Sequence, residues 1–453
     1  MTSAIEALQS ALGPKVSVGA DIPARNRADA SGLAPQPPAA LVMARSTEDV
    51  ATALRICHAH RQPVVTQGGL TGLAGGGQPI AGEVAISLER MTGIEEVDPA
   101  SATLTALAGT PLAVVQQAAD EAGFLCGIDL GARGTCTIGG NIATNAGGNQ
   151  VLRYGMTRRN ILGLEAVLAD GTVVTSLNKM LKNNAGYDWT QLLIGSEGTL
   201  GIVTRAVVAL HPKPTGQQTA LCAVESFEDA LNVLRGFQHA QPGRLLVFEA
   251  MWREFMTVAT GICGLPAPFE AEHEVVLLIE ADLDPDGFAA VLGEFYEGGL
   301  VKDAVVAQSR QDRARLWAYR ESPYEYGRFL PPLIRFDVSI PLGRMTDAVA
   351  HLRREIPPRW PEAVVVVFGH VADSNIHVEV ALEDADEATR KAIQAVVYDM
   401  VSAFKGSVSA EHGIGQIKRP YLARSRSEAE LALMRQLKAT FDPLGILNPG
   451  RVL

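Results

Sequence analysis

Three glycine-rich segments constrain the fold of this chain more than any other feature. They occupy residues 63–77, 134–148 and 195–203. Segments with so little side-chain bulk turn tightly and let backbone N–H groups approach a flat or anionic ligand. Because all three lie in the first half of the chain, they indicate one large, extended cofactor. Taken alone, the first segment also fits a flexible surface loop.

The spacing of the glycines disfavours two common nucleotide sites. No Gly-x-x-x-x-Gly-Lys-Ser/Thr is present, so the first segment is not a P-loop for nucleoside triphosphates. No regular Gly-x-Gly-x-x-Gly lies in a βαβ unit, which disfavours a Rossmann dinucleotide site.

Apolar runs and helical periodicity predict an α/β arrangement in the first half of the chain. Strands are expected at 41–44, 63–66, 84–88, 104–108 and 202–210, and helices at 49–60 and 112–122. The stretch 211–214, His-Pro-Lys-Pro, breaks this pattern. After it come a predicted helix at 227–239 and strands at 275–281, 335–340 and 364–368. We therefore expect a cofactor domain at 1–212, a substrate domain at 213–410, and a C-terminal segment at 411–453 that returns to helix.

Composition narrows the function classes. A formal net charge of -11 argues against nucleic acid as the main partner. The five cysteines are scattered and form no Cys-x-x-Cys pair, so we expect reduced thiols rather than disulfides or a thiolate metal site. The first residues lack the basic start and apolar stretch of a signal peptide, and no apolar run reaches the ~18 residues of a membrane span. The expectation is a soluble, cytoplasmic protein.

A second candidate site lies beyond the glycine-rich segments. His370 and His377 flank a turn that follows a buried apolar strand, and Glu411 precedes His412. Two imidazoles and one carboxylate suit a divalent cation and leave coordination positions open. On their own, histidines at this spacing also fit two hydrogen-bonded polar residues, so the spacing leaves both interpretations open.

The order of the segments resembles a known flavoprotein family. Pro-x-x-Thr-x-Gly-Gly-x-Thr-Gly, Ile-Gly-Gly-Asn-x-Ala-Thr-Asn-Ala-Gly-Gly and Gly-Ser-Glu-Gly-Thr-Leu-Gly-Ile follow one another as in FAD domains of the vanillyl-alcohol-oxidase type. Within that group the chain resembles the FAD-linked D-2-hydroxyglutarate and D-lactate dehydrogenases along nearly its whole length. The resemblance implies an α+β protein. Its FAD-binding domain would have two α/β subdomains, followed by an α+β cap domain and a C-terminal helical segment.

The resemblance also implies how FAD is held. The first segment would hold the pyrophosphate, the second would line the flavin and ribityl chain, and the third would lie near the adenine. The family's covalent members attach FAD through a histidine, and these segments contain none, so non-covalent FAD is expected. The implied contact residues are Thr66, Gln67, Gly68, Gly69, Leu70, Thr71, Gly72, Gly134, Thr135, Ile138, Gly139, Gly140, Asn141, Ala143, Thr144, Asn145, Gly147, Gly148, Glu197, Gly198, Gly201, Ile202, Val203 and Asn448.

For the second site, the resemblance implies a metal bound by His370, His377 and Glu411, with zinc expected first and manganese as the alternative. A cation that binds the substrate hydroxyl and α-carboxylate lowers the alcohol pKa. His412 would then accept the proton, although a third metal ligand or an orienting residue is the alternative role. The hydride would pass to flavin N5. The chain departs from the family at 372–375, where Ala-Asp-Ser-Asn replaces Gly-Asp-Gly-Asn.

Substrate recognition is expected to involve arginines. In the dehydrogenases that this chain resembles, an arginine fifteen residues before a lysine binds the distal carboxylate, and Arg320 and Arg335 match that spacing with arginine in place of lysine. Tyr324 stands where the family often has threonine, and Asn375 would hold the substrate carboxylate or orient a ligand. The alternative is that both arginines are surface residues paired with Glu321 and Asp337.

The leading hypothesis is therefore a D-2-hydroxyglutarate-type dehydrogenase, and its nearest rival is a D-lactate or broad-range D-2-hydroxy acid dehydrogenase. Electrons would pass to an external acceptor such as an electron-transfer flavoprotein, a quinone or a cytochrome, because no iron–sulfur Cys-x-x-Cys pattern is present. A soluble oxidase that uses oxygen directly is a further alternative. A non-catalytic FAD-binding subunit would not need the histidine segments. A homodimer is implied only by the resemblance.

Overall fold

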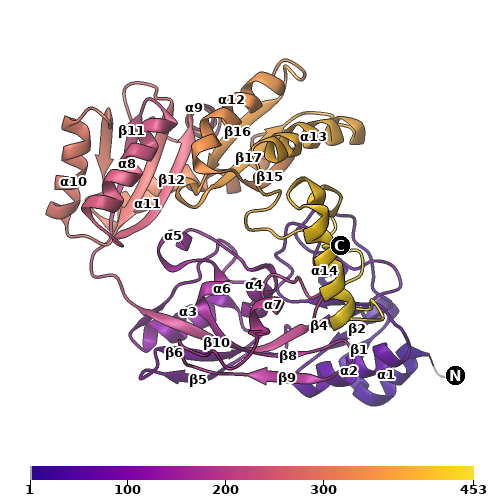
Figure 1. Cartoon of the computed structure of the whole chain (residues 1–453). Helices are drawn as coiled ribbons and strands as arrows, with labels where there is room; N and C mark the ends of the chain where they lie inside the picture. Colours follow the sequence, from indigo (N-terminus) through magenta and orange to yellow (C-terminus); the bar gives the residue numbers. More distant parts are fainter. Residues whose placement is uncertain (1–2) are drawn as a thin grey trace. The chain divides into compact units, whose positions relative to one another are not determined.

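The computed structural model describes residues 3–453, which form two compact units. The first unit combines the chain up to Lys213 with Glu411–Leu453, and the second is Pro214–Ala410. The C-terminal helix α14 (Glu428–Phe441) therefore belongs to the first unit, although the second unit precedes it in the chain (Figure 1).

The first unit begins with a small, mostly parallel sheet in the order β1-β2-β4-β3. Strands β2 and β3 run parallel to β4, and β1 is antiparallel to β2. Helix α2 (Thr47–Ala59) connects β2 to β3; it begins at Ser46, whose hydroxyl accepts a hydrogen bond from the Asp49 N–H. The bounds are β1 (Val16–Ser17), β2 (Ala40–Met43), β3 (Val64–Gln67), β4 (Val84–Ser87) and α1 (Ala4–Leu12).

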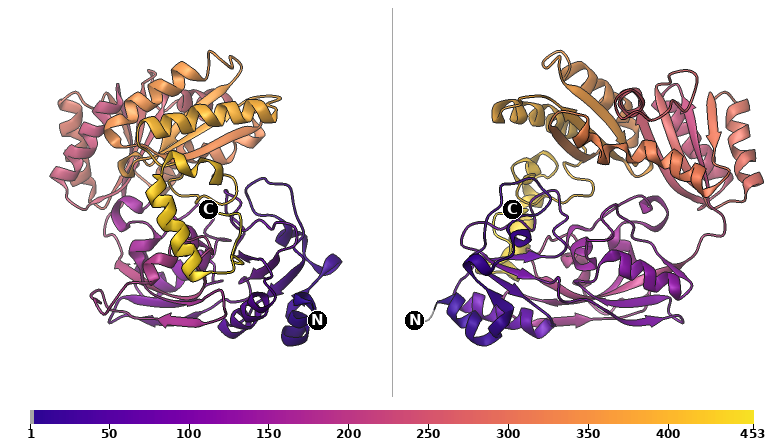
Figure 2. Two further views of the ribbon diagram at one scale, coloured as in Figure 1. Left: turned by 45° about the vertical axis from the view of Figure 1, so that its right-hand side comes forward. Right: turned by 180° about the vertical axis from the view of Figure 1, so that it is seen from behind.

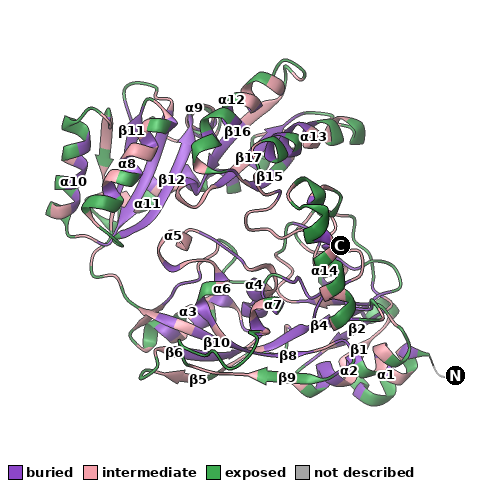
Figure 3. Ribbon diagram, viewed as in Figure 1, coloured by how far each residue is buried: buried purple, intermediate pink, exposed green. Residues whose placement is uncertain are grey.

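A second, antiparallel sheet completes the first unit in the order β5-β6-β10-β8-β9, with β7 paired to β10. Apolar side chains of both sheets share one core, and the ribbon of both sheets carries many buried residues, drawn purple in Figure 3. The elements are β5 (Ile94–Asp98), β6 (Thr103–Leu107), β7 (Phe124–Cys126), β8 (Ile161–Val167), β9 (Val173–Ser176), β10 (Ile202–Pro212), α3 (Leu112–Glu121), α4 (Ile138–Thr144), α5 (Val151–Tyr154), α6 (Thr157–Asn160) and α7 (Thr190–Leu193).

The second unit is built on a seven-stranded antiparallel sheet in the order β14-β11-β13-β12-β16-β17-β15. The central strand β12 and its neighbour β13 are buried along their whole length. The helices of this unit lie against its sheet (Figure 2). The strands are β11 (Gln218–Val224), β12 (Leu245–Trp252), β13 (Val275–Ala281), β14 (Asp303–Val306), β15 (Leu333–Ser339), β16 (Val364–Gly369) and β17 (Asn375–Ala381), and the helices are α8 (Phe227–Ala240), α9 (Arg253–Thr257), α10 (Pro285–Glu297), α11 (Arg310–Glu321), α12 (Met345–Glu355) and α13 (Glu387–Ala403).

The strands and helices predicted from periodicity are confirmed to within two residues. All five cysteines are free thiols, as expected, and four of them are buried. Within residues 3–453, no helix combines the length and the apolar character needed to cross a membrane.

Candidate functional site

The first and second glycine-rich segments pack directly against each other. A Cβ on Gly69 would lie 2.1 Å from the Thr135 carbonyl oxygen, and one on Gly68 would lie 2.7 Å from the Thr137 Oγ1. Neither position admits a side chain without a shift of the chain. The glycines are therefore required where the segment after β3 meets the segment before α4, and two stretches far apart in sequence form one surface.

The third segment joins the second through the backbone. The Gly195 and Glu197 N–H groups donate to the carbonyls of Ile142 and Ala143, at 2.9 and 2.8 Å. A Cβ on Gly198 would lie 3.0 Å from the Asn448 Nδ2. All three predicted segments and the C-terminal asparagine thus meet within the first unit. This arrangement fits an extended cofactor bound against glycine-lined backbone.

Part of the second segment is a helix rather than the open loop expected from its composition. Helix α4 begins after Thr137, whose hydroxyl accepts a hydrogen bond from the Gly140 N–H. A Cβ on Gly139 would lie 2.7 Å from the Ala108 Cβ, so glycine lets the helix pack closely against the chain after β6. The helix ends at Asn145, which is left-handed with φ 47°.

Two predicted cofactor residues use their side chains to hold the protein itself. The buried Gln67 amide donates to the carbonyls of Asn26 and Gly77 and accepts from the Asn26 amide. The Glu197 carboxylate accepts hydrogen bonds from the Ile414 and Gly415 N–H groups, at 2.6 and 2.8 Å. Burial raises the pKa of Glu197, although these two hydrogen bonds oppose the increase.

The remaining predicted cofactor residues follow the same three segments. Thr66 and Gln67 are the last two residues of β3, and Leu70 has φ 59° in the turn that follows. Gly147 and Gly148 follow α4, and the Gly148 N–H donates to the Glu411 carboxylate at 2.6 Å. The others lie in the turn after β3 (Thr71, Gly72), before α4 (Gly134), in α4 (Ile138, Asn141, Thr144), and at or beside the start of β10 (Gly201, Ile202, Val203).

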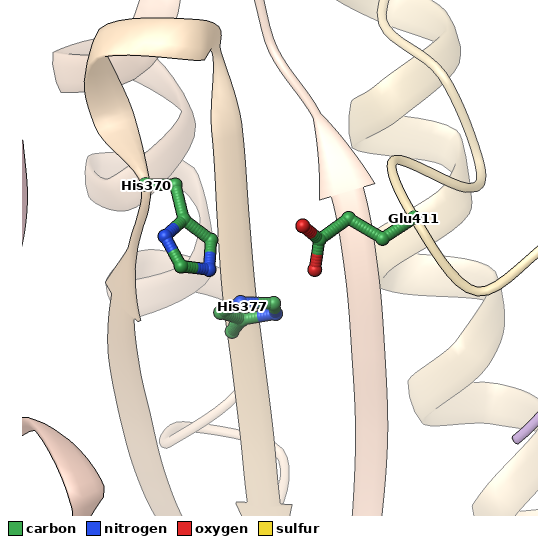
Figure 4. A group of neighbouring side chains, drawn as sticks. All are labelled: His370, His377 and Glu411. Carbon is green, nitrogen blue, oxygen red and sulfur yellow. The ribbon is translucent and has the colours of Figure 1, made fainter. Parts of the chain in front are cut away.

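The predicted metal ligands come together. His370 follows β16, and His377 lies in β17 across the turn, so the β16–β17 pairing brings the two imidazoles side by side. Ligand atoms of His370, His377 and Glu411 all lie within 4.8 Å of one another, and the three side chains point toward a common centre (Figure 4). Two ring nitrogens and a carboxylate oxygen at this separation fit a divalent cation.

A buried acid lies behind each histidine. The Glu249 Oε1 pairs with the His370 Nδ1, and the Asp337 Oδ1 lies 3.9 Å from the His377 Nδ1. Each acid is only 1% exposed. Burial alone would raise the pKa of Glu249, but the charges of His370 and Arg320 and their hydrogen bonds hold it below its ordinary value.

His412 belongs to the same cluster. Ligand atoms of Asp337, Glu411 and His412 also lie within 4.8 Å of one another. Ala410 immediately precedes this pair, and its N–H donates to the Asp337 carbonyl. A histidine beside a carboxylate is suited either to accept a proton or to complete a ligand set, so both predicted roles remain open.

The two predicted substrate arginines differ in environment. Arg320, at the end of α11, is buried, and its Nε donates to the Glu249 Oε2 at 2.6 Å. The Arg335 side chain, on β15, is 52% exposed and lies 3.4 Å from the Glu379 carboxylate. Of the alternative, surface arginines paired with Glu321 and Asp337, one part is borne out: Arg335 is half exposed. Arg320 is buried, and the acids paired with the two arginines are Glu249 and Glu379 instead.

The other two predicted substrate residues contrast in the same way. Asn375 is 3% exposed, and both polar atoms of its amide lack hydrogen-bond partners among the described residues. A buried amide with that capacity fits a polar ligand. Tyr324 is 73% exposed.

Two family models match successive parts of the chain. Residues 213–452 match the family model of the FAD linked oxidases, C-terminal domain, and residues 38–176 match that of the FAD binding domain. The chain is 40% identical over 417 residues to the mitochondrial D-2-hydroxyglutarate dehydrogenase of Bos taurus, covering 91% of this chain and 76% of the relative. The chain belongs to the FAD-linked D-2-hydroxy acid dehydrogenases.

A bacterial relative extends the match. The D-2-hydroxyglutarate dehydrogenase of Xanthomonas citri pv. viticola is 39% identical over 430 residues, which cover 92% of this chain and 89% of the relative. The family resemblance seen in the sequence is confirmed. The chain is an FAD-dependent oxidoreductase that acts on a CH–OH group.

Solved flavoenzymes share the fold of this FAD-linked dehydrogenase. A substrate-bound p-cresol methylhydroxylase superposes with a TM-score of 0.78 at 17% identity, covering 99% of this chain and 96% of that chain. An alkyldihydroxyacetonephosphate synthase superposes with a TM-score of 0.76 at 18% identity, covering 98% and 85%. The predicted α+β fold with a vanillyl-alcohol-oxidase-type FAD domain is confirmed.

Three acids near the site were not predicted from the sequence. They are Glu249 beside His370, Asp337 beside His377, and Glu379 beside Arg335. Burial raises the pKa of Glu379 to about 7 although Arg335 and Arg320 lower it. One signal for Glu249 was available, since it is the only charged residue in the apolar strand β12. A charge inside such a strand needs a partner.

Proposed function

We propose that this chain oxidises D-2-hydroxyglutarate to 2-oxoglutarate with non-covalently bound FAD. The observation that carries the proposal is the cluster of His370, His377 and Glu411, with Arg320 beside it. The Bos taurus and Xanthomonas citri relatives, which carry the name D-2-hydroxyglutarate dehydrogenase, support the choice of substrate.

Each catalytic requirement has a residue suited to it. When bound, FAD accepts the hydride at N5, and a divalent cation lowers the pKa of the hydroxyl that it binds. His370, His377 and Glu411 would hold that cation, zinc in the first instance and manganese as the alternative. His412 would accept the hydroxyl proton. The buried Asn375 amide would bind the substrate α-carboxylate.

Arg335 is the better candidate for the distal carboxylate. Its side chain is 52% exposed and lies 3.4 Å from the Glu379 carboxylate, whereas the Nε of the buried Arg320 is already bound to Glu249. A guanidinium that remains accessible binds a second carboxylate through charge-assisted hydrogen bonds.

The second candidate function is a D-lactate or broad-range D-2-hydroxy acid dehydrogenase. The sequence offers three aromatic residues for it, Tyr324, Tyr326 and Phe329. Tyr324 and Phe329 favour it, because they are 73% and 50% exposed in the segment after α11 and would accept an apolar side chain, whereas Tyr326 is fully buried and gives no support. In either case the electrons would leave FAD for an external acceptor such as an electron-transfer flavoprotein, a quinone or a cytochrome. The protein would act in the cytoplasm, as a homodimer.

The test is an anaerobic visible spectrum of the purified holoprotein with D-2-hydroxyglutarate, D-lactate or D-mandelate, before and after treatment with a chelator. We expect D-2-hydroxyglutarate to bleach the flavin band fastest. The bleaching should disappear on chelation and return with Zn²⁺ or Mn²⁺. Faster bleaching by D-lactate or D-mandelate would favour the second function. A bound flavin that no D-2-hydroxy acid reduces would overturn both and favour a non-catalytic FAD-binding subunit.

A further inference from the structure

Glu249 holds two functional side chains with its two oxygens. Its Oε1 pairs with the His370 Nδ1, and its Oε2 accepts from the Arg320 Nε at 2.6 Å. Glu249 lies on β12, a strand buried along its length, and its carboxylate is buried with its two partners. All three residues belong to the second unit, and their arrangement depends on that unit alone.

The pairing fixes which nitrogen of His370 faces a cation. A neutral imidazole that donates from Nδ1 keeps the lone pair on Nε2, the form that binds metals. The His377 Nδ1 also lies on the side of a buried acid, 3.9 Å from the Asp337 Oδ1, which is beyond hydrogen-bond distance. Both rings thus turn their Nδ1 sides toward buried acids.

Arg320 faces the same lone pair. Its Nη2 lies 3.3 Å from the His370 Nε2, and its guanidinium carbon lies 4.7 Å from the centre of the Phe368 ring. A cation bound at Nε2 would take the lone pair to which Arg320 otherwise donates. Arg320 and the cation therefore compete for the His370 Nε2. Glu249 instead binds Arg320 directly and supports the cation by orienting His370.

We propose that Glu249 is the positioning residue of the cation site, which orients His370 for metal binding while it anchors Arg320 beside the same nitrogen. The inference rests on the metal site of the proposed function. It assigns Glu249 a role that a simple counter-ion for Arg320 would not have, because a counter-ion would affect metal binding only through the arginine.

The experiment compares Zn²⁺ affinity in the flavin-loaded wild type, Glu249→Gln and Arg320→Met, measured by competition with a chromogenic chelator. Loss of a hydrogen-bond partner behind a metal-binding histidine weakens metal affinity roughly 10- to 100-fold. We expect that loss in Glu249→Gln. Arg320→Met should bind Zn²⁺ as tightly as the wild type or more tightly, since it removes the competing cation. Flavin absorbance and circular dichroism establish that each variant is folded.

If Glu249→Gln fails to fold because a buried arginine loses its partner, the double variant Glu249→Gln/Arg320→Met removes both charges and is compared with Arg320→Met. A loss of Zn²⁺ affinity in the double variant would support the positioning role. Equal affinities in a folded pair would overturn that role but leave the metal site intact. A wild type that binds no Zn²⁺ would overturn the metal site and the inference together.

Discussion

The side-chain carbonyl of Asn448 accepts a hydrogen bond from the Thr66 N–H, at 2.9 Å, although the two residues are 382 positions apart in the chain. The Asn448 amide nitrogen also donates to the Glu197 carbonyl at 2.8 Å. One buried side chain therefore joins the end of β3 to the third glycine-rich segment.

Replacing Asn448 should loosen both segments. Asn448→Gly is the suitable change, because Asn448 has φ 44° and glycine removes the amide without adding backbone strain. Two buried backbone groups would lose their partners, at about 1–3 kcal/mol each. We expect a free energy of unfolding lower by ~2–4 kcal/mol and faster flavin release, measured by chemical denaturation and flavin fluorescence. The exposed Asn184→Gly is the control, and an equal effect there would contradict the prediction.

Gly69 and Gly72 provide a matched pair within one segment. A Cβ on Gly69 would lie 2.1 Å from the Thr135 carbonyl oxygen, whereas one on Gly72 would meet nothing within 4 Å. Gly69→Ala should therefore separate the first two segments and abolish FAD binding, and Gly72→Ala should retain it. Flavin content after purification measures the difference. Full flavin content in folded Gly69→Ala would show that close packing of these segments is not required.

Arg335→Met tests recognition of the distal carboxylate. Loss of a charge-assisted contact at a half-exposed site should raise KM for D-2-hydroxyglutarate about 10- to 100-fold. KM for D-lactate, which has no second carboxylate, should change little. Arg328→Met is the control, since the Arg328 side chain is 75% exposed and pairs with nearby Glu325. Steady-state kinetics with each acid measure both KM values. Equal changes in KM for the two substrates would exclude recognition of the distal carboxylate by Arg335.

Ser374 occupies a backbone conformation that favours glycine. It has φ 74° and ψ 8° in the turn between the two histidines. The left-handed conformation costs a residue with a side chain about 1–2 kcal/mol, and glycine loses about 0.5–1 kcal/mol more entropy on folding. Ser374→Gly should therefore stabilise the protein by ~0.5–1 kcal/mol in denaturant titration. At the neighbouring Ala372, whose φ is negative, the same change should destabilise it.

Most of the fold could be predicted from the sequence, because buried strands such as β13 and capped helices such as α8 follow local periodicity. Helix α4 could not, since its two glycines disfavour a helix, and the Thr137 cap, the close contact with Ala108 and the burial of Ile138 and Ile142 that stabilise it are not evident from local periodicity.

The candidate site was predictable in its ligands but not in their surroundings. His370, His377 and Glu411 occur in recognisable motifs, and the strand pairing brings the two histidines together. Glu249 lies 121 positions from His370, and only the order of strands in the sheet makes them neighbours. For the same reason the partners of Arg320 and Arg335 could not be chosen from residues adjacent in sequence.

The interruption of the first unit by residues 214–410 has a consequence for synthesis. Leu447 pairs with Val64, and Asn448 binds Thr66, so β3 acquires these partners only after the entire second unit has been translated. Domains usually fold in order from the N-terminus as the chain emerges. Here the second unit can fold first on the ribosome, while the flavin-binding half waits for its last segment. FAD capture is then a late step in the maturation of this enzyme.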